Sequence, residues 1–181
     1  MSDSKQLNNF YALQVRQTRE SNFIKQVKEY GFDFFYKLYF PMRKLDLRKK
    51  GKIKAVSSAM FPGYVFLEVE DADSLSECLR TFRKIDGFER FLISNTQISP
   101  LRSRDLDIIL KFILIGPVLE KSQVIFDENS RIVVLHGPLT GLEGYIVKVD
   151  RRKKRAKIKL DIYNDSLFID LSFEVIEKVK P

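Results

Sequence analysis

Hydrophobic positions in the first two-thirds of the chain alternate between the spacing of strands and the spacing of helices. Four segments have the aromatic and β-branched composition of strands: residues 11–15, 32–40, 60–70 and 88–94. Three further segments repeat apolar residues at helical spacing: residues 23–30, 75–82 and 106–113. The resulting order (strand, helix, two strands, helix, strand, helix) favours an α+β sandwich, in which helices cover one face of a sheet.

Local signals predict where these helices begin and end. Gly31 follows the first helical segment, at the position where a glycine commonly ends a helix. Ser74 and Glu77 have the spacing of a capping box, in which the hydroxyl and the carboxylate satisfy free backbone N–H groups at a helix start. Ser103 is expected to cap the third helix.

Residues 43–57 interrupt the pattern with a strongly basic stretch that contains one glycine. The stretch predicts either a long hairpin arm or a mobile loop. Because exposed runs of charge are usually a solvated surface, the sequence leaves both alternatives open.

The helical spacing is absent after about residue 130. Five short strand-like segments follow one another there, separated by turn-forming residues: 131–135, 143–149, 155–160, 166–171 and 174–179. Five short strands in succession favour a small all-β barrel, with no helical alternative for this segment. The predicted division of the chain is an N-terminal domain, a linker and a C-terminal domain: 1–116, 117–129 and 130–181.

Composition adds an excess of positive charge to this two-domain fold. The chain has 181 residues, 44% of them hydrophobic, and a formal net charge of +8 with a pI near 9.5. Such an excess favours association with polyanions. A single cysteine, Cys78, fits a reducing compartment, and the polar N-terminus lacks a signal segment. The most apolar run, 108–119, is too short to cross a bilayer, so a cytoplasmic location without membrane contact is expected.

Much of the charge lies in the stretch VDRRKKRAKIKL, residues 149–160. Three apolar residues, Ala156, Ile158 and Leu160, alternate there with cations. This is the period of a half-buried strand rather than of a solvated tail, so the alternate cations are expected on an outer face of the barrel.

Three segments each resemble part of a known protein family: FYALQV at 10–15, FPGYVFLEV at 61–69 and HGPLTGLEGYIVKVDRRKKRAKIKL at 136–160. The first two resemble the opening strand and the Phe-Pro-Gly-Tyr strand of the NusG family of transcription elongation factors. The third resembles the family's KOW motif, a glycine-marked turn and hairpin in an SH3-like barrel. The order and spacing of the three segments cover almost the whole chain. The resemblance thus implies a NusG-type sandwich followed by a KOW barrel.

The same resemblance implies a role in transcription. An N-terminal domain of this type docks on RNA polymerase, where it grips a coiled-coil element of the clamp and bridges the DNA cleft. Equivalents of Phe61, Tyr64 and Phe66 line the depression that receives the clamp helices. Phe10 and Tyr11 are further candidates for polymerase binding, because aromatic side chains often dominate interfaces.

Each of these five aromatic side chains has core packing as its alternative role. Strand alternation places Tyr64 and Phe66 on one face and Val65 and Leu67 on the other, and only one of these faces can be covered by helices. Tyr64 carries a hydroxyl group and is therefore expected to be partly exposed.

Eight cations of the barrel are predicted to bind nucleic acid: Lys148, Arg151, Arg152, Lys153, Lys154, Arg155, Lys157 and Lys159. Lys148 is included because the strand before the basic turn is expected to bury three alternate residues: Tyr145, Val147 and Val149. Phosphate contacts by such a patch would make binding steeply salt-dependent. Nascent RNA, as a leader hairpin, is the expected partner, since specialised NusG paralogues, the LoaP-like antiterminators, are known for such recognition. General factors of the family use the barrel to bind Rho or ribosomal protein S10, and this alternative stays open.

Five further cations are candidates to face non-template DNA: Arg16, Arg19, Lys49, Lys50 and Lys52. For the lysines, which belong to the basic stretch 43–57, the alternative is a solvated loop.

The sequence contains no constellation typical of catalysis or metal binding. His136 and Cys78 are the sole residues of their kinds, whereas metal sites need clustered ligands. The glycines Gly137, Gly141 and Gly144 are not followed by the lysine and helix of a phosphate-binding loop, and are expected to supply positive φ or close packing in a turn. No enzyme activity, cofactor or metal is predicted.

Three functional hypotheses remain. The first is a specialised antiterminator that binds polymerase and nascent RNA, and the second is a general NusG-type factor whose barrel binds protein. The third is an RNA-binding or ribosome-associated KOW protein without a polymerase role, against which the FPGYVF segment argues. The chain is expected to act as a monomer.

Overall fold

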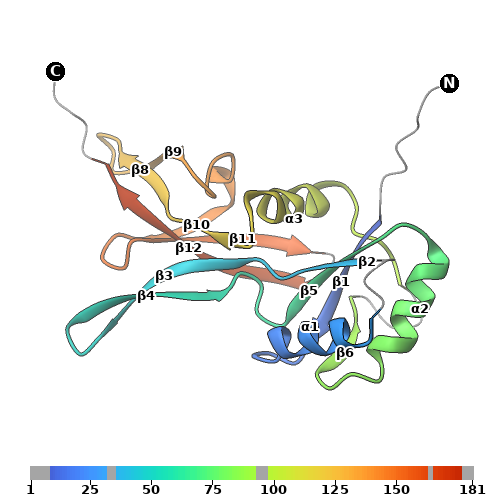
Figure 1. Cartoon of the computed structure of the whole chain (residues 1–181). Coiled ribbons are helices and arrows are strands. Elements are labelled where there is room, and N and C mark those ends of the chain that lie inside the picture. Colours follow the sequence, from blue (N-terminus) through green and yellow to red (C-terminus); the bar gives the residue numbers. More distant parts are fainter. Residues whose placement is uncertain (1–8, 32–35, 93–97, 163–164, 177–181) are drawn as a thin grey trace. The chain divides into compact units, whose positions relative to one another are not determined.

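The computed structural model describes residues 9–31, 36–92, 98–162 and 165–176 (Figure 1). The chain divides into two compact units. The first unit comprises Met1–Phe40 with Phe61–Ile108, and the second comprises Pro41–Met60 with Ile109–Pro181. No helix in the described ranges is long and apolar enough to span a membrane.

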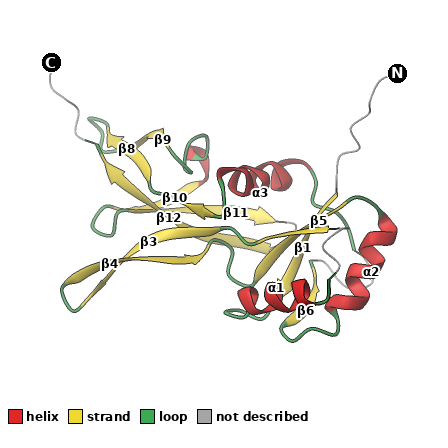
Figure 2. Ribbon diagram, viewed as in Figure 1, coloured by secondary structure: helices red, strands yellow, loops and turns green. Residues whose placement is uncertain are grey.

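The first unit contains a four-stranded antiparallel sheet and the helices α1 (Glu20–Glu29) and α2 (Ala72–Phe82) (Figure 2). Its strands lie in the order β2 (Tyr36–Tyr39), β5 (Tyr64–Val69), β1 (Asn9–Val15) and β6 (Phe88–Phe91). The predicted α+β sandwich is confirmed.

Both helices pack on one face of this sheet. Leu13 of β1 and the β5 residues Val65 and Leu67 share a buried core with Phe23 of α1 and Phe82 of α2. The rings of Phe23 and Phe82 meet edge to face, with centroids 5.5 Å apart. Burial of large apolar side chains from these four elements is the main stabilising contribution to this unit.

The helix ends agree with the sequence analysis at α1 and differ at α2. Gly31 follows α1 with φ +75°, and its N–H donates to the carbonyl of Lys28, as expected of a left-handed residue past a helix end. α2 begins before the predicted capping box, since its N-cap is Asp71, whose carboxylate accepts the Ser74 N–H at 2.7 Å. This hydrogen bond lowers the pKa of Asp71. The prediction of Ser74 as the cap was wrong, because an aspartate three residues earlier makes the same type of bond. The third helix, α3, covers Ser103–Ile115.

The second unit contains the predicted all-β domain. Five strands lie in the order β10-β11-β12-β8-β9: β8 (Ser122–Phe126), β9 (Ile132–His136), β10 (Ile146–Asp150), β11 (Arg155–Ile162) and β12 (Asp165–Val175). A short 3-10 turn at Glu143–Tyr145 precedes β10. Apart from this 3-10 turn, the elements formed by the described residues after 130 are all strands. This agrees with the predicted barrel and not with a helical alternative.

Two strand assignments needed correction. β8 and β7 (Val118–Leu119) lie within residues 117–129, for which the sequence predicts a linker. β8 was missed because it is short and begins with polar residues, although Ser122 and Val124 are fully buried. β12 is one strand that continues to Val175, so residues 174–179 do not start a fifth strand, and residues 177–181 lie outside the described ranges. The division into domains at 116 and 130 stays a prediction.

Residues 43–57 form the long hairpin arm rather than the loop. β3 (Met42–Lys49) and β4 (Lys52–Ala59) are paired along their whole length and are joined by a turn at Lys50 and Gly51, both with positive φ (Figure 1). At its base the arm pairs with β7, with Met42 opposite Val118. Arg43 is buried there and donates to the Met60 carbonyl at 3.1 Å. Burial lowers its pKa, against the opposing effect of the Asp170 carboxylate.

Replacing Gly137 with alanine is expected to lower the free energy of unfolding by about 2 kcal/mol or more. Gly137 has φ +106°, and a Cβ at this position would lie 2.7 Å from the Cα of Ser122, a backbone atom that cannot move aside. The matched control is Gly144→Ala, where a Cβ meets nothing within 4 Å. Denaturant unfolding of both variants checks this prediction, and equal losses of stability at the two glycines would contradict it.

Candidate polymerase and nucleic-acid interfaces

The alternation predicted for the basic strand is present in β11. Ala156, Ile158 and Leu160 are buried, and the residues between them point to the other side of the sheet. Lys157 lies opposite Lys148 of β10 and Asp170 of β12. We call the side of β10, β11 and β12 that carries these three residues the outer face.

The strand β10 carries a bulge that the sequence did not reveal. Ile146 pairs with Ile158, and Lys148 pairs with Lys157, so Val147 is an extra residue on β10. Val147 is 55% exposed, which corrects the prediction that it faces the core. Lys148 still lies on the outer face, because it follows the extra residue and pairs with Lys157.

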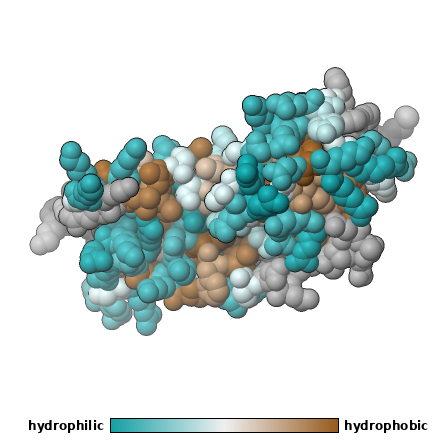
Figure 3. Space-filling view, turned by 90° about the horizontal axis from the view of Figure 1, so that it is seen from below, coloured by the Kyte–Doolittle hydropathy of each residue, from teal (hydrophilic) through white to brown (hydrophobic). Residues whose placement is uncertain are grey.

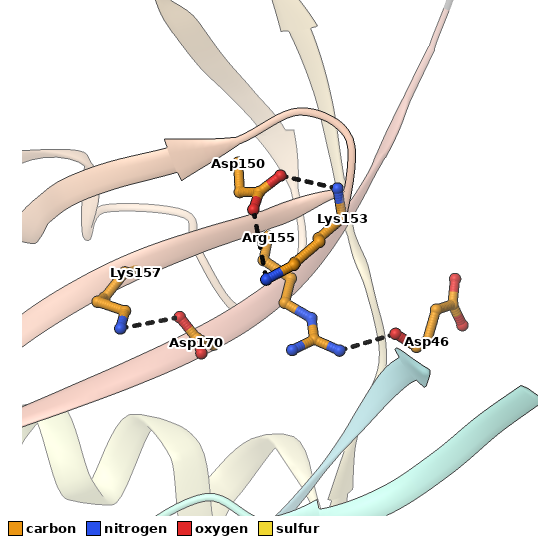
Figure 4. Close-up of polar contacts among 6 residues, drawn as sticks. All are labelled: Asp46, Asp150, Lys153, Arg155, Lys157 and Asp170. Carbon is orange, nitrogen blue, oxygen red and sulfur yellow. Dashed lines mark hydrogen bonds and ion pairs between the residues drawn. The ribbon is translucent and has the colours of Figure 1, made fainter. Parts of the chain in front are cut away.

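Carboxylates on neighbouring positions hold three of the eight predicted cations, and Figure 4 shows two of these pairs, those of Lys153 and Lys157. Lys157 is 3.8 Å from Asp170, and Lys159 is 3.2 Å from Asp161. Asp150 accepts the backbone N–H of Lys153 at 2.9 Å and lies 3.9 Å from its ammonium group. The backbone hydrogen bond lowers the pKa of Asp150. The outer face is therefore of mixed charge rather than purely basic.

The unpaired positive charge lies in the turn between β10 and β11, which we call the basic turn (Arg151–Lys154). Arg152 and Lys154 are exposed, and neither side chain makes a hydrogen bond or an ion pair within the described part of the chain. Lys154 adopts φ +53°, and its carbonyl accepts the N–H of Phe173 at 2.9 Å, so the turn is anchored to β12. Arg155, the next residue, donates to the backbone carbonyl of Asp46 at 2.7 Å and is half-buried.

A groove of about 550 Å³ lies between the hairpin arm and the basic turn. Its lining combines cations with apolar side chains: Asp46, Leu47, Ile53, Arg152, Lys153, Lys154 and Arg155. Asp46 is the one acidic residue of this lining, and its carboxylate is already bound by Lys121 at 2.6 Å. A second hollow of about 100 Å³ on the outer face includes Lys148, Lys153 and Lys157. The groove suits a phosphate backbone, because its one carboxylate is already bound by Lys121, whereas the second hollow also contains the carboxylates of Asp150 and Asp170.

Figure 3 shows hydrophilic side chains over most of one face of the molecule, with separate hydrophobic patches between them. Large hydrophobic side chains that are exposed in the second unit include Leu47 and Ile53 of the arm.

Arg151, unlike its neighbours, has a structural role. Its guanidinium lies 3.9 Å from the centroid of the Phe126 ring and donates to the carbonyl of Ser130 at 2.7 Å. The side chain of Arg151 is thus engaged between β8 and the following turn, and its contact with nucleic acid stays a prediction.

Alanine at Arg151 is expected to lower the free energy of unfolding by about 1 kcal/mol, the size of one exposed cation–π contact together with one hydrogen bond. Arg152→Ala, one residue away, is expected to change it by less than about 0.5 kcal/mol. Thermal unfolding of the two single variants tests the difference. Equal stability of both would show that the Phe126 contact contributes nothing.

The aromatic candidates for polymerase binding divide between the two faces of the first sheet. Tyr11 lies on the face that the helices cover, where it is buried and meets Phe91 edge to face at 6.3 Å. Phe61 and Phe66 are also buried, with ring centroids 5.1 Å apart. The prediction that these three side chains contact a partner directly is therefore corrected. They are buried and support the fold instead.

Phe10 and Tyr64 are half-buried, and the partial exposure expected for Tyr64 is confirmed. Phe10 stacks on Tyr39, with centroids 6.1 Å apart. Sequence analysis missed Tyr39, whose hydroxyl donates to the Glu68 carboxylate. Burial, followed by this hydrogen bond, raises the pKa of Tyr39 to about 12. Phe10, Tyr39 and Tyr64 form what we call the aromatic face, on the side of the sheet opposite the helices.

The turn before β5 is held by a residue that the sequence analysis overlooked. Gly63 adopts φ +83°, and its N–H donates to the carboxylate of Glu20 at 2.7 Å. Glu20 is buried at the start of α1, so the Phe-Pro-Gly-Tyr turn is tied to this helix. The turn thereby fixes the position at which the chain enters β5 at Tyr64.

The cations proposed to face DNA belong to both units. Arg16 is exposed and pairs with Asp86 at 3.3 Å, and Arg19 is exposed at the N-cap of α1. Lys50 and Lys52 are exposed at the tip of the arm, whereas the side chain of Lys49 lies outside what the structure describes.

Cys78 lacks the character of a reactive thiol, and no metal site is found in the described ranges. Burial raises the pKa of the Cys78 thiol to about 12, so it is protonated at neutral pH. No group of three or more His, Cys, Asp or Glu side chains among the described residues is placed to hold a metal ion.

Comparisons with known proteins identify relatives of both units. Residues 8–110 match the sequence profile of the family described as "Transcription termination factor nusG". The "Transcription termination/antitermination protein NusG" of Bacillus subtilis is 26% identical over 161 residues, which cover 88% of this chain and 90% of that protein. Its namesake from Thermus thermophilus is 24% identical over 165 residues, with the same two coverages.

A solved structure described as "Domain interaction in Thermotoga maritima NusG" superposes with a TM-score of 0.55. The superposition covers 91% of this chain and 93% of that chain at 20% sequence identity. At this level of identity the similarity supports the fold.

Proposed function

Because this chain belongs to the NusG family of transcription termination and antitermination factors, we propose that it binds RNA polymerase through its first unit and nascent RNA through the basic turn. Antitermination is the outcome that this pair of contacts favours, since a factor that holds both polymerase and its transcript stays with the elongating complex. As a partner of polymerase, the chain acts in the cytoplasm as a monomer.

The aromatic face supports the polymerase contact. Phe10, Tyr39 and Tyr64 place three partly exposed rings on one side of a rigid sheet, and partly exposed aromatic side chains are typical anchors of protein interfaces. The buried pair Phe61 and Phe66 gives this face a packed base. The domain division at 116 and 130 is retained in this proposal, with residues 1–116 as the polymerase-binding part.

The observation that carries the RNA contact is the unpaired charge of the basic turn. Arg152 and Lys154 are exposed beside a groove whose single acidic residue is neutralised by Lys121. Lys148 and Lys153 extend the positive surface to the smaller hollow. A leader hairpin is the form of RNA that we propose, and the exposed lysines at the tip of the arm, Lys50 and Lys52, are proposed as a secondary contact to non-template DNA.

A second candidate function rests on a different surface of the barrel. Val133 and Leu135 of β9 and Val147 of β10 are exposed apolar side chains. Exposed apolar side chains of this kind would suit a protein partner of the barrel, such as Rho or ribosomal protein S10. The two candidates differ in which substitutions impair binding: cations of the basic turn for RNA, and these three apolar residues for protein.

The proposal is tested with the full chain, purified RNA polymerase and an RNA hairpin, measured as two separate binding reactions. We expect binding in both. Absence of polymerase binding would refute the first contact, and RNA binding that is equally strong for any RNA would reduce the second to nonspecific charge.

A further inference from the structure

An exposed aromatic side chain lies on the outer face of the barrel. Phe168 of β12 is 58% exposed, whereas its neighbours Ile169 and Leu171 are buried. β12 pairs with β11 along Asp165–Ser172, whereas its pairing with β8 covers only Phe173–Val175, so Phe168 projects from the part of β12 that is hydrogen-bonded to β11. Exposure of so large an apolar side chain to water is unfavourable. No contact within the described part of the barrel accounts for the outward position of Phe168.

The neighbours of Phe168 on this face include lysines of β11 as well as Asp170 of its own strand. The register of β11 and β12 places Lys159 directly opposite Phe168, and Lys157 one position further along the same face. Lys148 follows across β10, opposite Lys157. Three lysines therefore lead from the ring of Phe168 towards the basic turn.

The acidic residues of this face do not prevent the lysines from binding phosphate. Lys157 and Lys159 pair with Asp170 and Asp161, and all four side chains are at least one-third exposed in these pairs. Ion pairs of this exposure are weak, so a phosphate can take the place of the carboxylate at little cost.

We propose that Phe168 is a stacking platform for an unpaired base of the bound RNA, a proposal that rests on the RNA contact proposed above. An aromatic ring flanked by cations is the arrangement with which proteins hold single-stranded RNA, because the ring stacks on a base while the cations contact the adjoining phosphates. A base within a duplex is already stacked on its neighbours. Phe168 thus selects RNA with an accessible loop or bulge, whereas the basic turn binds phosphates of any RNA.

The charge of the surroundings favours RNA over a protein as the occupant of this site. The other exposed apolar side chains of the barrel, Val133, Leu135 and Val147, lie on β9 and β10. Phe168 is instead paired across the strands with Lys159, and charged residues such as lysine are depleted at the centres of protein interfaces.

The test compares Phe168→Ala, Phe168→Leu and Phe168→Tyr in the full chain. Fluorescence anisotropy is measured with two probes, an RNA hairpin with a single-stranded loop and the same stem as an uninterrupted duplex. Phe168→Ala and Phe168→Leu are expected to bind the loop RNA roughly tenfold to a hundredfold more weakly, while Phe168→Tyr binds like the native chain. Duplex binding is expected to be unchanged in all three variants, and so is the dependence of affinity on salt, because no phosphate contact is lost.

A matched control is Leu135→Ala, which removes a side chain of similar exposure (50%) from β9. It is expected to leave the affinity for loop RNA unchanged. Unfolding curves of all variants exclude loss of the fold as the cause.

Three outcomes would overturn the proposal. Equal affinity of Phe168→Ala and the native chain for loop RNA would refute the stacking role and leave the RNA contact of the basic turn intact. Equal losses in Phe168→Leu and Phe168→Tyr would show that aromaticity is not what matters. Absence of RNA binding by the native chain would refute the proposed function together with this inference.

Discussion

Replacing Phe10 and Tyr64 together with alanine is expected to weaken binding of the full chain to RNA polymerase by about tenfold or more, the effect of losing interface anchors. Both residues are half-buried on the aromatic face, so their removal exposes no large cavity. Phe10 also stacks on Tyr39, so the double variant removes one ring of this stacked pair together with the ring of Tyr64. Surface plasmon resonance with immobilised polymerase measures the change.

The control for this variant is Tyr30→Ala. Tyr30 is 50% exposed at the end of α1, on the helical side of the unit, so it has the same aromatic character at a different place. We expect it to bind polymerase with native affinity. A loss in Tyr30→Ala as large as that in the double variant would show that the aromatic face is not the specific site.

Replacing Arg152 and Lys154 together with alanine is expected to weaken RNA binding and to flatten its salt dependence. Each lost phosphate contact lowers the slope of log K against log salt by about 0.7–0.9. Arg151 is left intact because its contact with Phe126 stabilises the barrel, and a variant at that position would confuse stability with binding. Filter binding or anisotropy over a range of salt concentrations measures the affinity and its slope.

A charge-matched control is available in the first unit. Arg83 and Lys84 are exposed cations after α2, and their replacement by alanine removes the same charge from the chain. This control is expected to reduce RNA affinity only slightly. If both pairs of substitutions had equal effects, net charge rather than the basic turn would explain the binding.

The elements best predicted from sequence are those whose two faces differ strongly in polarity. In β11, the alternation of lysines with Ala156, Ile158 and Leu160 identified both the strand and its buried side. In β5, the alternation separated Val65 and Leu67 from Tyr64 and Phe66, although it did not show which of the two faces the helices cover. Period-two alternation encodes burial directly, and so these predictions needed no knowledge of the partner strands.

What the sequence could not reveal depends on contacts between distant residues. Arg151 looked like its neighbours until the structure placed Phe126 beneath it. The bulge at Val147 depends on the pairing of β10 with β11, and the ion pair of Lys157 with Asp170 depends on the pairing of β11 with β12. Register between strands is set by the whole sheet, so local patterns do not contain it.

Phe168 shows a signal that was present but not used. Leu167, Phe168 and Ile169 are consecutive apolar residues, which hides their alternation. The alternate positions Ile169, Leu171 and Phe173 are all buried, and counting back from them places Phe168 outward. A search for the most regular apolar alternation along the strand would have found it.

The measurement that tests the account most directly uses transcription elongation complexes assembled with RNA polymerase. In one complex the nascent RNA emerges as a hairpin, and in the other ribonuclease has trimmed it to the polymerase surface. The account predicts that the full chain binds both complexes, binds the hairpin complex more tightly, and loses only this difference when Arg152 and Lys154 are replaced by alanine. Equal affinity of the native chain for the two complexes, or binding to neither, would contradict it.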